Sequence, residues 1–337
     1  HIIVSVLKNV TPKLCIFLPP SPHFSSVNRP FLILTLISTP SNLAICCAFL
    51  DMLLTDGKLM ATDIILFHLA LSNLMVALSR SVPQTLTAFG CTNLFDDLGC
   101  KVIVFCFRLY RGLSISLTCL LSVYQAVIIS PAITKLAMLK NGLSRSLVPL
   151  IIFLYVFCGS TNVYPILYAV SKLINNTVPP YTFNLEFCFI PYPDAASYVS
   201  AGLINFFRDF LFILLMAIMS VYILILLYQH GKKVKSIRSS DRGHSEARPE
   251  TKASRAVVTL VILYVIFFGV DNVIWLYSLS VFRVATLIND IRVFFATLYT
   301  SVCPVVVIAT NPKVKAKLAF QTLNVLHSLL LKVYVNS

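Results

Sequence analysis

Seven apolar stretches, each long enough to cross a lipid bilayer, dominate this sequence and leave little choice about its fold. A membrane-spanning α-helix needs about 20 consecutive, mostly apolar residues. The seven stretches lie at about 31–54, 62–87, 101–129, 147–171, 199–229, 255–282 and 287–310. Because a bilayer offers no water to the backbone N–H and C=O groups, each stretch must satisfy these groups within its own helix. The sequence therefore predicts an all-α membrane protein with a bundle of seven transmembrane helices.

The composition agrees with this class of protein. Hydrophobic residues make up 58% of the 337 residues and charged residues only 12%, whereas about 45–50% of a soluble domain is apolar. The net charge of +14 comes from basic residues that lie mostly between the apolar stretches. Nucleic-acid-binding proteins instead gather such residues on one polar surface, so we expect no nucleic-acid partner.

The positions of the basic residues predict which side of the membrane each segment occupies. They are concentrated between the third and fourth stretches, between the fifth and sixth, and after the seventh. Segments rich in Lys and Arg stay in the cytoplasm, and seven crossings put the chain ends on opposite sides. This predicts an extracellular N-terminal segment at 1–30, a membrane domain at 31–310 with a third cytoplasmic loop at 231–254, and a cytoplasmic tail at 311–337.

Two further features concern the loops and the tail. Asn-x-Thr sequons at Asn9 and Asn175 both fall on the predicted outer side, where N-glycosylation takes place. After Pro312, the run KVKAKLAF alternates lysine with apolar residues. This run fits either a short helix at the membrane surface, with lysines that reach the headgroups, or a simple basic tail.

Several charged residues lie inside the apolar stretches, where they need a physical explanation. An arginine at the centre of a membrane helix costs at least about 2.5 kcal/mol, so it usually faces the bundle interior or a wet cavity. Arg108 and Arg111 are three residues apart and therefore share one face of their helix. Counted at about 1.5 Å per residue from the predicted outer helix ends, the embedded charges lie roughly 10–16 Å deep, in one layer. They are Arg80, Arg108, Arg111, Arg208, Asp209 and Asp271.

This charged layer has two possible roles. The aspartates can pair with arginines to hold the helices together, or the layer can surround a cavity that opens to the outside. Because four arginines face two acids, pairing leaves a net positive charge, which favours an anionic or hydrogen-bond-accepting organic ligand. We adopt the cavity interpretation. The predicted ligand-binding residues are Arg80, Arg108, Arg111, Arg208, Asp271 and Tyr277.

The sequence lacks the motifs of common enzymes and metal sites. It contains no HExxH, no GxSxG and no glycine-rich phosphate-binding loop. It also contains no C-x-x-C pair and no Cys/His zinc spacing. We therefore predict no catalytic residues, no cofactor and no metal, and a protein that is not an enzyme.

Three segments carry a resemblance to a known family. They are HLALSNLMVALSRSVPQT at 68–85, GCKVIVFCFRLYRGLSISLTCLLSVYQAVIISP at 99–131 and RDFLFILLMAIMSVYILILLYQHGKKVKSI at 208–237. The chain, over roughly residues 31–318, resembles the vomeronasal type 1 pheromone receptors, and in particular their fish counterparts, the olfactory receptors related to class A. The resemblance implies a G-protein-coupled receptor in the plasma membrane of olfactory sensory neurons.

The resemblance also implies roles for particular residues. Cys100 and Cys188 match the family's disulfide between the third span and the second outer loop, and Asn175 matches the glycosylated site in that loop. Asn73 stands where the wider rhodopsin-like superfamily has a sodium-binding aspartate, and Tyr124-Gln125-Ala126 stands where it has Asp-Arg-Tyr. Vomeronasal type 1 receptors resemble this chain in most of these departures, which supports that subfamily.

The implied mechanism is that a small odorant or pheromone binds one arrangement of the helices better and so opens a cytoplasmic crevice to a heterotrimeric G protein. The residues predicted to face the G protein are Gln125, Lys135, Lys232 and Lys233. The lysines can equally set the topology and contact anionic membrane lipid. Two alternatives remain, a bitter-taste-type receptor and a transporter or channel. The sequence leaves open whether the receptor is a dimer.

Overall fold

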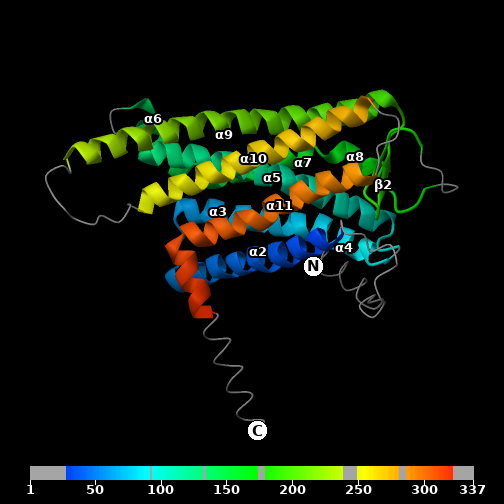
Figure 1. Ribbon diagram of the computed structural model, residues 1–337, viewed down its shortest axis with the longest axis horizontal. Coiled ribbons are helices and arrows are strands. Elements are labelled where there is room, and N and C mark those ends of the chain that lie inside the picture. Colours follow the sequence, from blue (N-terminus) through cyan, green and yellow to red (C-terminus); the bar gives the residue numbers. More distant parts are fainter. Residues whose placement is uncertain are drawn as a thin grey trace, which may run out of the picture.

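The computed structural model is a bundle of long helices that lie side by side, with a small hairpin at one end (Figure 1). It describes residues 28–91, 93–131, 134–173, 179–237, 249–280 and 286–321. The predicted glycosylation sites, Asn9 and Asn175, lie outside these ranges. We call the two ends of the bundle the hairpin end and the far end.

Helices make up most of the described chain. Their bounds are α2 Asn28–Asp56, α3 Ala61–Val76, the π-helical turn η3 Ala77–Ser81, α4 Val82–Ala88, α5 Asp97–Ile129, α6 Lys135–Arg145, α7 Leu147–Ser160, α8 Val163–Leu167, α9 Ala195–Ile237, α10 Pro249–Ser280 and α11 Thr286–Thr310. The two strands are β1 Thr182–Asn184 and β2 Phe189–Pro191. Because α3, η3 and α4 continue one another, they act as one long element.

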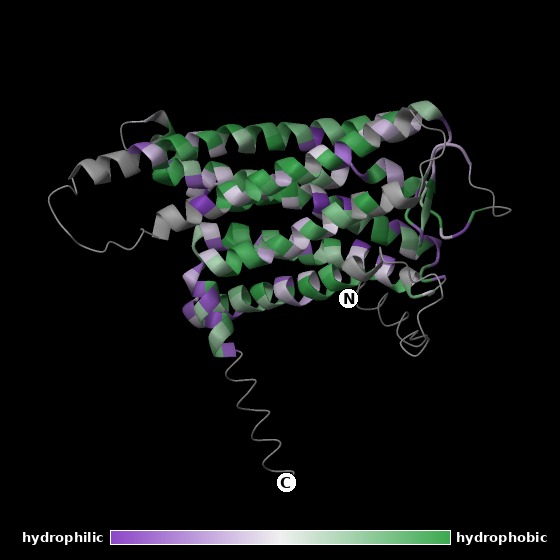
Figure 2. Cartoon of the chain, in the orientation of Figure 1, coloured by the Kyte–Doolittle hydropathy of each residue, from purple (hydrophilic) through white to green (hydrophobic). Residues whose placement is uncertain are grey.

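The long helices correspond to the seven predicted stretches. Within the described residues, five helices are long and apolar enough by themselves to cross a membrane. The pair α6 and α7, bent by 64°, supplies a sixth, and the apolar part of α11, Thr297–Thr310, is shorter. Outward faces are apolar, as on α9, where Phe207 is 62% exposed. Figure 2 shows this pattern along the outer helices, and it fits a bundle surrounded by lipid.

Helix α5 is the central element of the bundle. Its apolar window is 83% buried, and it contacts α3, α7, α9 and α10. Leu113, Leu117 and Leu121 are almost completely buried and fill the core, while Gly112 and Ser114 on the same helix leave room for neighbouring side chains. This alternation of large and small residues lets other helices pack closely around α5.

The hairpin of β1 and β2 closes one end of the bundle. Its strands are antiparallel, with Phe183 opposite Ile190. Leu185 and Ile190 are buried in a cluster that includes the start of α5. The disulfide between Cys100 and Cys188 joins the hairpin to α5, which confirms the pairing implied by the family resemblance. The hairpin is thus held by a covalent bond and by its own apolar contacts.

Loss of this disulfide is expected to weaken the fold. It links residues 88 positions apart, and a disulfide typically contributes about 2–4 kcal/mol, more for longer loops. We expect Cys188→Ser to lower both the midpoint of thermal unfolding and delivery to the cell surface, measured by a thiol-independent dye assay and by flow cytometry. Cys47→Ser, at an exposed free cysteine, is the control. Equal behaviour of the two variants would contradict the prediction.

The helix bounds add detail to two of the predicted segments. The predicted loop at 231–254 is helical at both of its edges, because α9 continues to Ile237 and α10 begins at Pro249. A long helix extends readily, since each added residue gains a hydrogen bond once the first turn has formed. The predicted stretch at 147–171 is also interrupted, because α7 ends at Ser160 and the short α8 follows.

The start of the tail forms a short helix at 312–321, and its position at a membrane surface stays a prediction. Val314 on this helix is fully buried. Lys313 lies 3.4 Å from the carboxylate of Asp63, and Lys317 lies 3.0 Å from that of Asp51. Two of the lysines therefore pair with acids at the far end of α2 and α3.

Candidate functional site

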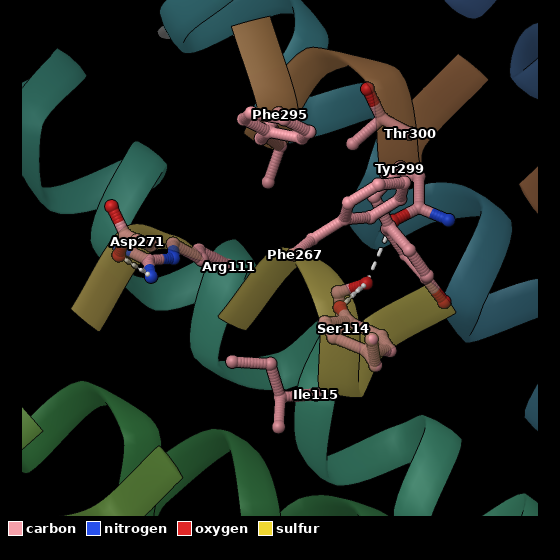
Figure 3. A pocket seen from close by; sticks show the side chains of 11 residues that line it. Arg111, Ser114, Ile115, Phe267, Asp271, Phe295, Tyr299 and Thr300 are labelled. Carbon is pink, nitrogen blue, oxygen red and sulfur yellow. Dashed lines mark hydrogen bonds and ion pairs between the residues drawn. The ribbon is translucent and has the colours of Figure 1, made fainter. Parts of the chain in front are cut away.

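Two cavities that are lined by described residues lie inside the bundle. The hairpin cavity has a volume of about 100 Å³ and the central cavity about 50 Å³. The hairpin cavity is lined by Phe107, Arg108, Arg111, Phe183, Tyr192, Tyr198, Gly202, Asn205, Phe206, Arg208, Asp209, Asp271 and Asn272. The central cavity (Figure 3) is lined by Asn73, Val76, Arg111, Ser114, Ile115, Tyr264, Phe267, Asp271, Phe295, Tyr299 and Thr300. Arg111 and Asp271 line both.

The order of these residues along two helices shows how the cavities are arranged. From the hairpin end, α5 presents Arg108 to the hairpin cavity, Arg111 to both cavities and Ser114 to the central cavity. The antiparallel α10 presents Phe267 to the central cavity and Asp271 to both. Three residues correspond to about one helical turn. The central cavity therefore lies about one turn farther from the hairpin, with Arg111 and Asp271 at the boundary.

An ion pair between Arg111 and Asp271 forms this boundary (Figure 3). Nη2 of Arg111 donates a hydrogen bond to Oδ2 of Asp271 at 2.6 Å. The two side chains are 32% and 18% exposed, so both remain open to the cavities. Arg111 also interacts electrostatically with Asp209 of α9. The pair therefore connects α5 to α10 between the two cavities.

A second ion pair, between Arg208 and Asp209, is much more deeply buried. Both side chains are 5% exposed, and Nη2 of Arg208 lies 2.7 Å from Oδ1 of Asp209. Nη1 of Arg208 also donates to Oγ1 of Thr161 at 2.9 Å. A Cβ atom at Gly112 of α5 would lie only 3.1 Å from Cζ of Arg208. The guanidinium is held on several sides by the protein, so Arg208 supports the cavity wall.

Arg108 differs from the other two arginines of the hairpin cavity. Within the described residues, its partners are the hydroxyl group of Tyr192 and the ring of Phe183, whose centroid lies 5.8 Å from Cζ. Both partners are neutral, so no carboxylate directly offsets the charge of Arg108. The described lining contains three arginines and two aspartates. One positive charge is therefore in excess, and it can attract the anionic group of a small molecule.

Arg80 was expected at the ligand, but it lines neither of these two cavities. Its side chain lies in the π-helical turn η3 and is only 3% exposed. It donates a hydrogen bond to the carbonyl oxygen of Leu185 at 3.2 Å and lies 5.6 Å from the ring centroid of Phe187. The hydrogen bond of Gln84 to Glu186 reinforces this contact. Arg80 therefore anchors the tip of the hairpin to the bundle.

The anchoring role of Arg80 can be tested by hydrogen exchange. A hydrogen bond from a charged group contributes about 1.5–3 kcal/mol. We expect Arg80→Gln to raise the amide exchange rate of the hairpin, followed by mass spectrometry of peptides that cover 183–191. Arg145→Gln, at an exposed arginine of α6, is the control and should leave this exchange unchanged. Unaltered exchange in Arg80→Gln would show that the hairpin is held without it.

The remaining predicted residues lie away from the cavities. Tyr277 of α10 is 50% exposed and lines neither cavity. Gln125, predicted to face a G protein, lies near the far end of α5 and is only 4% exposed, so its side chain points into the bundle in this arrangement. The side chains of Lys135, Lys232 and Lys233 lie outside the described part of the structure.

Several lining residues were missed by the sequence analysis. Tyr192 and Phe183 come from the hairpin, outside every apolar stretch, and reach the cavity only because the hairpin folds over α5. Tyr264 and Ser114 are polar groups within apolar stretches, and Tyr264 donates a hydrogen bond to Ser114 at 2.7 Å. A search of the apolar stretches for hydroxyl-bearing side chains, and not only for charged ones, would have found Tyr264 and Ser114.

Comparison with known proteins identifies the family. The model of the "Vomeronasal organ pheromone receptor family" matches residues 27–320. The chain is 41% identical over 283 residues to "Olfactory receptor class A-like protein 1" of Danio rerio, covering 84% of this chain and 88% of that protein. It is 28% identical to "Vomeronasal type-1 receptor 1" of Gorilla gorilla gorilla, covering 84% and 80% of the two chains. These matches favour the vomeronasal resemblance over the bitter-taste alternative.

A solved structure confirms the fold class. The crystal structure of squid rhodopsin aligns with a TM-score of 0.68 at 18% sequence identity, covering 92% of this chain and 87% of that chain. The predicted seven-helix membrane fold is therefore confirmed. The family match extends over the helices that form both cavities and includes the linked pair Cys100 and Cys188. This protein is a multi-pass membrane receptor with a rhodopsin-like fold, and it belongs to the vomeronasal organ pheromone receptor family.

Proposed function

We propose that this protein is a chemosensory G-protein-coupled receptor that binds a small organic anion in the hairpin cavity. The observation that carries the proposal is the position of Arg108. Its guanidinium lines this cavity, and its partners in the described structure are neutral. A carboxylate or related oxyanion can form two parallel hydrogen bonds with such a group.

The walls of the cavity suit the rest of such a ligand. Phe183, Tyr198 and Phe206 present aromatic rings to the same space. Small-molecule sites are usually lined by apolar and aromatic side chains, with a few polar groups that fix the orientation. A molecule with one anionic group and a compact apolar body fits this combination.

We further propose that the hairpin end is extracellular, with the N-terminus outside and the C-terminal tail in the cytoplasm. Support comes from the basic residues of the loops and the tail, which favour the cytoplasmic side, and from the disulfide at the hairpin end, since disulfides persist in oxidising compartments. The names of the two relatives, an olfactory receptor and a vomeronasal receptor, support a location in the plasma membrane of olfactory sensory neurons.

The proposed mechanism is a population shift. A ligand that binds one arrangement of the helices more tightly favours that arrangement in proportion to its differential affinity. The hairpin cavity lies between α5, α9 and α10, so a ligand there can change how these helices pack. A heterotrimeric G protein at the far end would then recognise the favoured arrangement.

A response assay tests this function. The receptor is expressed with a heterotrimeric G protein, and calcium or cAMP is recorded while small organic acids and amines of matched carbon skeleton are applied. We expect acids to give the stronger responses, and no response when the G protein is left out. A preference for amines would contradict the anion site. Solute flux in liposomes that contain only the purified protein would favour the transporter alternative.

A further inference from the structure

The ion pair between Arg111 and Asp271 lies where the hairpin cavity and the central cavity meet. On α5, Arg108 lines the hairpin cavity and Ser114 the central one, and Arg111 between them lines both. On α10, Asp271 likewise lines both cavities. Because the two charged groups are 2.6 Å apart, a molecule cannot pass between them. A route between the cavities that runs between Arg111 and Asp271 is therefore closed while this pair is formed.

The central cavity has its own hydrogen-bonding chemistry. The hydroxyl of Tyr264 donates to Oγ of Ser114, and the hydroxyl of Ser114 donates to Oδ1 of Asn73, each at 2.7 Å. Nδ2 of Asn73 is buried and makes no hydrogen bond of normal geometry within the described structure. Its polar neighbour is the thiol of Cys303, which is only a weak acceptor. A buried N–H group without a good partner costs about 1–3 kcal/mol. Because Asn73 lines the cavity, a hydrogen-bond acceptor on a bound molecule would satisfy this donor.

Charge limits what this cavity can accept. Among its described lining residues, the charged ones are Arg111 and Asp271, which are already paired at the boundary. The rest of the wall is apolar or hydroxyl-bearing, as with Val76, Phe295 and Thr300. An ion placed here would lose its hydration without gaining a counter-charge. The cavity suits an uncharged group with a hydrogen-bond acceptor, such as a hydroxyl or a carbonyl.

We infer that the central cavity is a second, deeper binding subsite for an uncharged hydrogen-bond-accepting group, and that the ion pair of Arg111 with Asp271 is its gate. An organic anion next to Arg108 is also within reach of Arg111, which borders the same cavity, and it competes with Asp271 for the guanidinium. When Asp271 is displaced, the two cavities join. Displacement of Asp271 by an organic anion rests on the proposed function. The gate formed by the ion pair does not depend on that function.

Access to the central cavity can be measured without a known ligand. Thr300→Cys places a thiol in its wall, and methyl methanethiosulfonate, a small neutral reagent, is applied to the full-length receptor in membranes. We expect Asp271→Asn to raise the modification rate of the introduced cysteine by about tenfold or more, because the gate is then open in a larger share of molecules. The receptor with native Thr300 corrects for its own cysteines. Asn205→Cys, in the hairpin cavity, is the matched control and should react equally with and without Asp271→Asn.

Two further variants test whether the ion pair itself controls the modification rate. Exchange of the charges, Arg111→Asp together with Asp271→Arg, should return the rate to its original slow value. If Asp271→Asn does not reach the membrane, Arg111→Gln opens the same pair from the other side. If the introduced cysteine were modified at the same rate with the ion pair intact and with the ion pair broken, the gate would be overturned.

A separate experiment keeps the native ion pair of Arg111 with Asp271 and adds butyrate, with tetramethylammonium chloride as the cationic control. Acceleration by butyrate alone supports displacement of Asp271 by an anion. Acceleration by Asp271→Asn without any effect of butyrate supports the gate and counts against the anion site of the proposed function. The two ideas therefore fail separately.

Discussion

Arg208→Ala is expected to destabilise the folded receptor by about 3–5 kcal/mol, the cost of breaking a buried ion pair from one side. The truncation leaves the carboxylate of Asp209, which is 5% exposed, without the guanidinium that now lies 2.7 Å away. It also removes the hydrogen bond to Thr161 that links α9 to the segment between α7 and α8. The measurement is the midpoint of thermal unfolding of the detergent-solubilised protein, together with the amount that reaches the cell surface.

A double variant separates charge from packing. Arg208→Met together with Asp209→Leu removes both charges while it keeps most of the volume, and such replacements are often neutral or stabilising. We expect the double variant to be clearly more stable than Arg208→Ala. If the two were equally unstable, the loss would come from packing against Gly112, and the ion-pair explanation would be wrong.

Arg108→Ala is expected to lower the potency of organic acids by about 30-fold to several thousand-fold, because truncation of one partner of a buried charged pair costs 2–5 kcal/mol. Its neutral partners, Tyr192 and Phe183, leave its charge available to a ligand. The measurement is the dose–response curve for the acid that gives the strongest response, corrected for surface expression. Surface delivery should change little, since no carboxylate of the described structure pairs with Arg108.

The matched control is Lys101→Ala, one positive charge removed from the same helix at a residue that lines neither cavity. Lys101→Ala should shift the dose–response curve by less than about threefold, because the attraction of this charge for the ligand is screened by solvent and salt. Tyr192→Phe should give an intermediate shift, because it removes a hydrogen bond that orients Arg108. An unchanged dose–response curve for Arg108→Ala would show that the anionic group of the ligand binds at another site.

Much of the fold follows from the sequence because the bilayer restricts the choices so strongly. Long apolar runs must be helices there, so the helical elements could be located to within a few residues. One exception is α9, which continues to Ile237, beyond the predicted stretch at 199–229. The family resemblance added the disulfide between Cys100 and Cys188, which residue spacing alone could not assign.

The site was only partly predictable. A count of residues gives the depth of a charge along its helix, and the depths of Arg108, Arg111 and Asp271 did place them at one level. It cannot say which element lies opposite a side chain. That is why Arg80, in the same predicted layer, holds the hairpin instead, and why Tyr277 lines neither cavity.

The membrane helices, the family and the excess of positive charge among embedded residues could thus be predicted from the chain alone, because they depend on composition and on position along each helix. The folded bundle was needed to show that, among the described residues, Arg111 pairs with Asp271 while Arg108 meets neutral partners. It was also needed to show that this pair borders both the hairpin cavity and the central cavity. Pairing and cavity shape depend on how helices rotate and pack against one another, and on the path of the hairpin across them, which no single helix encodes.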